Sequence, residues 1–180
     1  PTGWTTGDVL GSGQSAAMKL SAVNACVEVI SNSISKLPIF IMDKKTRNRL
    51  EHPLLHLLEE RPNEAMTPSV YKKLMEVNRL LGGNGYALIV RDPASARPRE
   101  LIPLPYTCCN PYTDDSGSLW YVYTNPKTGE MRKLSPFDIL HYKAYSEDGL
   151  TGISVLSRAR STIQASLAAQ RYEGRFYSQN

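Results

Sequence analysis

Residues that could bind a metal ion or transfer protons are few in this 180-residue sequence, and they are poorly grouped. His52 and His56 stand four residues apart, which would place both imidazoles on one helix face, as a zinc site requires. Pro53 puts His52 at or before the start of that helix, however, where side-chain directions are irregular. Ordinary surface or capping histidines are therefore the simpler interpretation, and we predict no metal site.

The three cysteines are a second possible site of chemistry. Cys108 and Cys109 are adjacent, so they would point to opposite faces of a strand. Only Cys26 and His141 could join them, and both are distant in the sequence, so buried thiols are the default interpretation. Three cysteines cannot form a paired disulfide framework, which favours a reducing compartment.

Paired carboxylates are the remaining candidates, because metal-dependent nucleases bind Mg²⁺ through clustered Asp and Glu. Asp114-Asp115 precede Ser116-Gly117, and Glu147-Asp148 precede Gly149, and both arrangements are typical of turns. The sequence also has no GxxxxGKS or GxxxxGKT loop, no GxSxG elbow and no HExxH helix. It gives no positive sign of catalysis, so we predict no catalytic residue and no cofactor.

The composition describes a globular chain of 20.0 kDa, with 41% hydrophobic and 21% charged residues, enough for one domain with one core. The longest apolar run, residues 37–42, is far shorter than the roughly 20 residues of a membrane span. No signal peptide is visible. A membrane protein and a disulfide-stapled secreted module are therefore both excluded. The chain starts at Pro1 without Met and stops at Asn180 after a helical pattern, so we interpret it as a piece of a longer protein.

The net charge is +4, and most of the surplus lies in the last thirty residues. Four arginines stand there against the single acidic residue Glu173; they are Arg158, Arg160, Arg171 and Arg175. This surplus is compatible with contact to a polyanion but does not demonstrate it.

The first part of the chain is predicted to be helical after a flexible arm of residues 1–20, which is rich in Gly, Ser and Thr. Apolar residues then recur every three or four positions, as on one helix face, up to Pro38. They are Val23, Cys26, Val27, Ile30, Ile34 and Leu37. A strand over residues 39–43, a charged turn and a short helix from His52-Pro53 to just before Pro62 are expected next.

The next helix has the clearest limits. Thr67 is its expected cap, Pro68 its first residue, and Gly82-Gly83 its stop. Its predicted buried stripe is Val70, Tyr71, Leu74, Val77, Leu80 and Leu81. A strand over residues 84–91 should follow.

The middle of the chain is rich in predicted strands. They cover residues 101–104, 107–112, 119–124, 130–134 and 139–143, and the third and fourth should form a hairpin. A loop containing Gly149 and Gly152 then leads into a last helix over residues 154–178. Helices followed by antiparallel strands and one long helix predict an α+β fold rather than alternating βαβ units.

That last helix would be roughly 37 Å long and carries three stripes of side chains. Leu156, Ile163 and Leu167 form an apolar stripe in its first half, and Ala165, Ala169, Tyr172 and Phe176 form another on nearly the opposite side. Arg160, Gln164, Arg171 and Arg175 lie between them. One interpretation is a lone amphipathic helix with solvated arginines. The other is a helix packed between subunits, whose polar stripe faces a shared space.

Taken in order, several short motifs resemble the portal proteins of tailed double-stranded DNA bacteriophages. The resemblance runs from about Ser21 to Asn180. It is carried by Ser21 to Cys26, Leu37-Pro38, His52-Pro53-Leu54, Arg61-Pro62-Asn63, Met66-Thr67, Gly83-Asn84-Gly85-Tyr86, Leu101 to Leu104 and Ile139-Leu140-His141. Its most specific stretch is residues 148–154, followed by the helix ending at Phe176.

The resemblance implies a non-enzymatic ring, usually a dodecamer, at one vertex of the capsid. Such rings nucleate capsid assembly, dock the large terminase subunit, pass double-stranded DNA during packaging and ejection, and contact capsid, scaffold and head-tail adaptor proteins. They are expected in the virion, and in the host cytoplasm during assembly. Residues 21–153 would be the wing domain and 154–180 the first stem helix, with the clip, second stem helix, tunnel loop and crown absent.

Within such a ring, we expect Arg160, Gln164, Arg171 and Arg175 to face the DNA channel or a subunit boundary. Leu156, Ile163, Leu167, Tyr172 and Phe176 would pack the helix against its neighbours. A sparse arginine stripe suits weak, sequence-independent contact, because each neutralised phosphate strengthens binding. Two alternatives remain, a metal-dependent phage nuclease and a ring-forming capsid or adaptor protein that never meets DNA.

Overall fold

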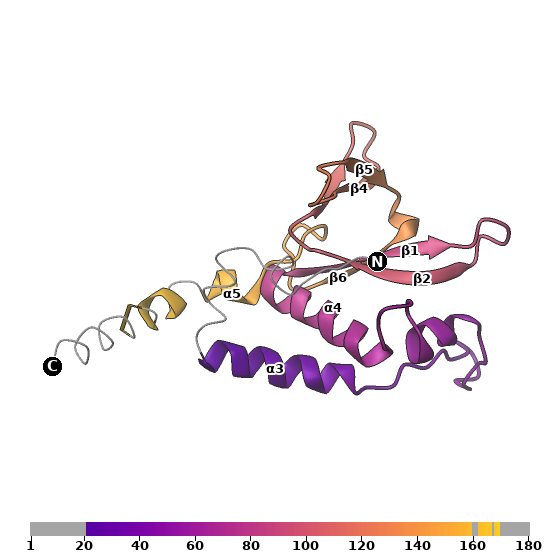
Figure 1. Cartoon of the computed structure of the whole chain (residues 1–180), viewed down its shortest axis with the longest axis horizontal. Coiled ribbons are helices and arrows are strands. Elements are labelled where there is room, and N and C mark those ends of the chain that lie inside the picture. The colour runs from indigo at the N-terminus through magenta and orange to yellow at the C-terminus, as the bar shows by residue number, and fades with distance from the viewer. Residues whose placement is uncertain (1–20, 160–161, 167, 170–180) are drawn as a thin grey trace.

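A computed structural model describes residues 21–159, 162–166 and 168–169 of the chain. Two long helices lie below one small sheet, and a second small sheet rises on the other side (Figure 1). In chain order the helices and helical turns are α3 (Ser21–Ser35), the π-helical turn η1 (His56–Glu60), α4 (Pro68–Gly82), the 3-10 turn η2 (Pro136–Asp138) and α5 (Val155–Arg158). The strands are β1 (Asn84–Arg91), β2 (Pro98–Leu104), β3 (Cys109–Thr113), β4 (Leu119–Thr124), β5 (Met131–Leu134) and β6 (Ile139–Lys143). This mixture of helices and antiparallel strands confirms the predicted α+β fold class.

Both sheets are three-stranded and antiparallel, with the orders β2-β1-β6 and β3-β4-β5. Because side chains alternate along a strand, β1 serves two cores. Tyr86 contributes to a cluster that includes Cys109 and Tyr121 of the second sheet, whereas Ala87 packs with Tyr71 and Met75 of α4. The first sheet is therefore the middle layer of the body.

The limits of α4 are set by the residues that the sequence indicated. The Thr67 hydroxyl oxygen accepts a hydrogen bond from the Val70 N–H at 3.4 Å, and Pro68 opens the helix. Gly83 closes it with φ of +79°, a left-handed conformation that glycine adopts without strain. Val70 is exposed rather than buried, but the rest of the predicted stripe is buried or half-buried.

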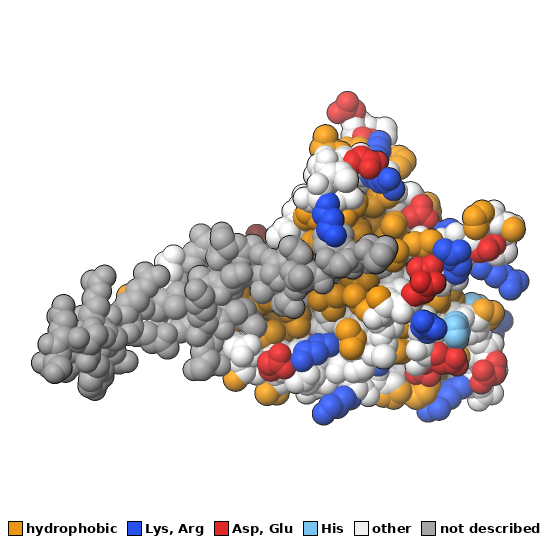
Figure 2. Space-filling view, viewed as in Figure 1, with side chains coloured by type: hydrophobic (Ala, Val, Ile, Leu, Met, Phe, Trp, Pro, Cys, Tyr) orange, Lys and Arg blue, Asp and Glu red, His pale blue; other side chains and the backbone are white. Residues whose placement is uncertain are grey.

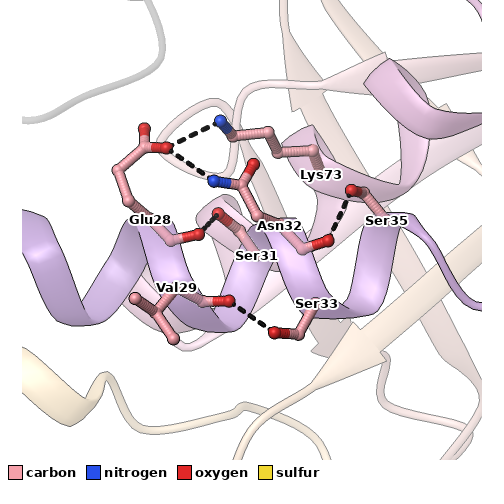
Figure 3. Close-up of polar contacts among 7 residues, drawn as sticks. All are labelled: Glu28, Val29, Ser31, Asn32, Ser33, Ser35 and Lys73. Atoms are coloured by element: carbon pink, nitrogen blue, oxygen red, sulfur yellow. Dashed lines mark hydrogen bonds and ion pairs between the residues drawn. The ribbon is translucent and has the colours of Figure 1, made fainter.

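The predicted buried stripe of α3 is wrong for most of its residues. Val27 is buried and Val23 packs against the core, but the other four members are exposed, namely Cys26, Ile30, Ile34 and Leu37. The face toward the body carries Ser31 and Ser35 instead. Their small side chains let α3 and α4 approach closely, and their hydroxyls donate to carbonyls of their own helix, Ser31 to Glu28 and Ser35 to Asn32 (Figure 3).

Polar contacts hold α3 in this orientation along one flank (Figure 3). The Glu28 carboxylate lies 2.9 Å from the Lys73 ammonium of α4 and accepts a hydrogen bond from the Asn32 amide. The pair with Lys73 lowers the pKa of Glu28. The opposite flank of α3 is left with apolar side chains in solvent.

Three further predictions differ from the structure. Residues 39–43 were predicted as a strand but form none. An isolated antiparallel bridge between Met42 and Arg49 is their only strand-like pairing within the described residues. The short helix near His52 becomes a π-helical turn, in which the Arg61 N–H donates to the His56 carbonyl. The strand predicted over residues 107–112 begins two residues later, since residues 105–108 form a turn.

The last predicted helix is described only in part. Val155–Arg158 forms α5, and residues 162–166 and 168–169 are also helical and project away from the body (Figure 1). Residues 160–161, 167 and 170–178 of the predicted helix, and the predicted arm of residues 1–20, lie outside the described residues. Charged side chains of both signs are mixed over the opposite end of the body (Figure 2). No helix within the described ranges has the length and apolarity needed to cross a membrane.

Candidate functional site

The turn after α4 packs directly against the loop before α5. The Gly83 carbonyl accepts a hydrogen bond from the Ala144 N–H at 2.8 Å, and Gly152 lies against the same carbonyl. A Cβ atom on Gly152 would overlap the Gly83 carbonyl oxygen, and one on Gly83 would overlap the Gly152 carbonyl oxygen. We call this contact the junction and define it by Gly83, Asn84, His141, Gly152 and Ser154.

Asn84 joins the two backbones at the junction. Its Nδ2 donates to the Gly152 carbonyl at 2.9 Å, and its Oδ1 accepts from the Gly152 N–H at 2.8 Å. The side chain is only 7% exposed, so water does not compete for these bonds. A single amide group therefore pairs a loop with a strand 68 residues away in the sequence.

His141 connects this amide to the second sheet. Its Nε2 lies 2.8 Å from Asn84 Oδ1, and its Nδ1 lies 3.1 Å from the Tyr121 hydroxyl. Tyr86 packs on the imidazole with ring centroids 4.4 Å apart. Burial, with a smaller contribution from Lys143, lowers the pKa of His141 to about 4. The neutral imidazole then donates from Nε2 to Asn84 and accepts at Nδ1 from Tyr121.

Ser154 fixes the first residues of α5 to the last turn of α4. Its hydroxyl donates to the Leu81 carbonyl at 2.6 Å and accepts from the N–H groups of Leu156 and Ser157. The serine is thus the N-cap of one helix and a partner for the free carbonyl end of another. The direction in which the chain leaves the body is set at this residue.

The loop between β6 and the junction is organised by Asp148. The carboxylate accepts hydrogen bonds from the N–H groups of Thr151 and Leu150 and from the Ser146 hydroxyl, and these bonds lower its pKa. The Lys143 ammonium holds the Gly149 carbonyl. The predicted turn at Glu147-Asp148 is confirmed.

The other candidates for chemistry have local partners. Asp114 forms the predicted turn, where bonds from the Ser116 hydroxyl and the Ser118 N–H lower its pKa to about 2. His56 lies 2.9 Å from Glu60, and burial raises the pKa of Cys109 to about 12. Within residues 21–159, 162–166 and 168–169, no three His, Cys, Asp or Glu side chains are grouped closely enough to hold a metal ion.

The junction includes Gly152 and Ser154 of the most specific sequence motif, residues 148–154, and that motif lies within the range matched by a family model. The family model described as "Phage portal protein" matches residues 21–180. The chain belongs to the phage portal protein family. The portal protein of Enterobacteria phage HK97 is 27% identical over 167 residues, which cover 89% of this chain and 38% of that protein. Protein BeeE of Escherichia coli strain K12 is 34% identical over 95 residues, covering 51% of this chain and 59% of that protein.

Solved structures share the portal fold. A chain in the neck of an empty gene transfer agent particle, computed with C6 symmetry, superposes with a TM-score of 0.78 at 23% identity and covers 93% of this chain. An HK97 family phage portal protein from Corynebacterium diphtheriae gives 0.62 at 15% identity and covers 89%. This chain spans 47% and 48% of those two chains, which is about half of their length.

The predicted site residues of this portal chain are only partly described. Gln164 is exposed, Ile163 is half-buried, and Leu156 is half-buried against the core that Val27 and Leu80 line. Six others lie outside the described residues, namely Arg160, Leu167, Arg171, Tyr172, Arg175 and Phe176. Their roles in the channel or between subunits remain predictions.

Sequence reasoning gave no role to Asn84, His141 or Ser154. A signal was present for Asn84, which stands between two glycines at the start of a strand with an otherwise apolar core. A buried amide beside residues without side chains is typical of a backbone-to-backbone contact. Nothing in the spacing, however, connects it to Gly152.

Proposed function

We propose that this chain is the wing domain and the start of the first stem helix of a portal protein, which forms a ring at one capsid vertex. The observation that carries the proposal is the match of residues 21–180 to the portal family. The relatives add support, because one is the HK97 portal protein and another chain with this fold belongs to a neck computed with C12 symmetry. We place the wing at residues 21–153 and the stem helix from residue 154.

In this proposal the ring conducts double-stranded DNA during packaging and ejection. It also nucleates procapsid assembly and binds the large terminase subunit, scaffold and capsid proteins, and the head-tail adaptor. The portal family is structural, and we propose that the chain catalyses no reaction. It would be found in the virion, and in the host cytoplasm before assembly is complete.

The stem helix would contribute the DNA-facing surface. We propose that Arg160, Gln164, Arg171 and Arg175 face the channel or a subunit boundary, while Leu156, Ile163, Leu167, Tyr172 and Phe176 pack the helix. A sparse arginine stripe binds phosphate weakly and without regard to sequence, because no base-reading group accompanies it. A map of the ring in which the three arginines lie on its outer wall would contradict this placement.

Electron microscopy of the full-length protein, viewed along the particle axis, tests the ring directly. We expect closed rings with a central hole wide enough for a DNA duplex. A protein that stays monomeric across all concentrations tested, with no rotational symmetry, would refute the proposal.

The two alternatives predict different behaviour in solution. A metal-dependent nuclease would cleave plasmid DNA with Mg²⁺, and none of the described carboxylates is grouped to favour that activity. A ring-forming adaptor would not bind terminase. For the portal we expect terminase binding, no plasmid cleavage, and weak DNA binding whose affinity falls steeply with salt.

A further inference from the structure

Phe137 is a large apolar side chain held out in solvent. It is 82% exposed, more than any other large hydrophobic residue in the described part of the chain. The turn that carries it is nevertheless fixed: Arg91 bonds the Asp138 carboxylate at 3.0 Å and the Phe137 carbonyl at 2.8 Å, and the Ser135 hydroxyl caps the Phe137 N–H. Little conformational entropy would be lost if this side chain entered a partner.

An apolar groove lies elsewhere on the same molecule, between the end of α3, the middle of α4 and β6. Its volume is about 280 Å³. Its apolar lining includes Ile34, Leu37, Ile39, Tyr71, Met75 and Tyr142. An enclosed cavity of about 150 Å³ holds a benzene molecule, so the volume of the groove is sufficient for a phenyl ring. The groove continues the exposed apolar flank of α3, in which Ile34 and Leu37 are 39% and 55% exposed.

Phe137 cannot reach the groove of its own chain. It precedes β6, whereas Tyr142 of the groove lies near the other end of that strand. Five residues of extended chain separate the two by roughly 16 Å. The charges at the two surfaces can also pair. Asp138 flanks Phe137 and bonds Arg91 through Oδ1, and its side chain is 40% exposed, so the carboxylate can face a second cation. Lys72, whose ammonium bonds the Leu37 carbonyl, stands at the edge of the groove and supplies that cation. Glu76, the acidic residue of the groove, is already paired with Arg79.

We propose that Phe137 of one copy inserts into the groove between α3, α4 and β6 of the next copy. This inference rests on the proposed ring and names the contact that closes it. Two different surfaces of one chain meet in such a contact, so it is head-to-tail, and head-to-tail contacts generate rings when their rotation closes. The exposure of Ile30 and Ile34 on α3 then has a physical reason, since this apolar flank would be covered in the assembly.

Paired cysteines in the full-length protein test the contact. The background carries Cys26→Ser and Cys108→Ala, because Cys26 is exposed and Cys108 is half-buried. Cys109 is buried, and its raised pKa keeps the thiol unreactive. Into this background we would introduce Phe137→Cys and Ile34→Cys, together and singly, and add a short bismaleimide cross-linker. We expect a ladder of covalent multimers from the double variant and none from either single variant.

The outcomes separate this inference from the proposed function. Rings in the electron microscope without a ladder from the double variant would overturn the contact and leave the portal ring standing. A cross-linked dimer from either single variant would overturn it as well, because it would show that two identical positions face each other across the contact. If the unmodified full-length protein forms no rings at any concentration, both proposals fail.

A charge at position 137 gives an independent measurement. Phe137→Asp should weaken each subunit contact by about ten- to hundred-fold, the value of burying one large apolar side chain. Dilution series followed by sedimentation would show rings dissociating at correspondingly higher concentration, with unchanged circular dichroism. Met131→Asp is the matched control, since Met131 is 72% exposed on β5 and should leave assembly within about two-fold of the unmodified protein. Equal effects of the two variants would refute the contact.

Discussion

The junction and the exposed apolar residues of α3 cover polar and apolar groups in opposite ways. We call the latter the outer flank of α3 and define it by Val29, Ile30 and Ile34. At the junction, Asn84, His141 and Ser154 are satisfied by partners in their own chain. On α3, by contrast, Ile34 and other large apolar side chains are left in solvent while Ser31 is buried. The difference teaches that one region is complete within a single subunit, whereas the other leaves apolar surface that the proposed assembly would cover. Substitutions should therefore act on folding at the first region and on association at the second.

The largest effect on folding is expected from Gly83→Ala. The new Cβ would overlap the Gly152 carbonyl, and alanine would have to adopt φ of +79°. Left-handed strain and overpacking together should lower the free energy of unfolding by about 2–4 kcal/mol. Urea denaturation followed by tryptophan fluorescence measures this loss. Gly117→Ala is the control, since Gly117 has φ of +81° in open space and should cost only about 1 kcal/mol.

Asn84→Ala tests whether the buried amide is the link between strand and loop. The change leaves the His141 Nε2–H and both backbone groups of Gly152 without partners, so we expect a loss of about 1–3 kcal/mol in the free energy of unfolding. Asn110→Ala removes the same group from an exposed position of β3 and should change stability by less than about 0.5 kcal/mol. Similar losses for both variants would show that the junction bonds add nothing.

The pH dependence of stability should reveal His141. Its pKa is about 4 in the folded chain, below the ordinary value of 6.5, so the unfolded chain binds the proton more readily. The contribution of His141 is complete above about pH 6.5 and is lost as the pH falls toward 4. In His141→Gln, the slope of unfolding free energy against pH should flatten between those values. An unchanged slope would mean that groups other than His141 control stability in this pH range.

The smallest effect on folding is expected on the outer flank of α3. Val29 is 66% exposed, and Val29→Ser should change the free energy of unfolding by less than about 0.5 kcal/mol, because valine and serine have similar helix propensities. A thermal melt of the unassembled chain measures this. A loss comparable to that of Asn84→Ala would show that the flank is already packed within one subunit, which would erase the contrast between the two regions.

Short-range signals in the sequence predicted most helices and strands, whereas contacts between segments that are distant in the chain left no signal in it. Thr67, Pro68 and Gly83 mark the ends of α4 because capping depends on neighbouring residues alone. The prediction of which side of α3 is buried was wrong, because burial depends on the element that lies beside the helix. Small serines allow α4 a closer approach than isoleucines do. A period of apolar residues indicates a helix without saying which of its contacts belong to another subunit.

The candidate site was anticipated only as a string of motif residues. Residues 148–154 stood out, and their turn was correctly predicted from Asp148 and Gly149. Their contact with Asn84 could not be predicted. Asn84 and Gly152 are 68 residues apart, and a hydrogen bond between distant residues produces no periodic pattern in the sequence. The channel residues of the last helix remain predictions for the same reason, because their neighbours are not encoded in the spacing.

Ser154 has a mechanical consequence for the assembled particle. Its one hydroxyl bonds the last turn of α4 and the first turn of α5 at once. A tilt or rotation of α5 against α4 must break at least one of these bonds, each worth about 1 kcal/mol. Movement of the first turn of α5 is therefore coupled through this one hydroxyl to the last turn of α4.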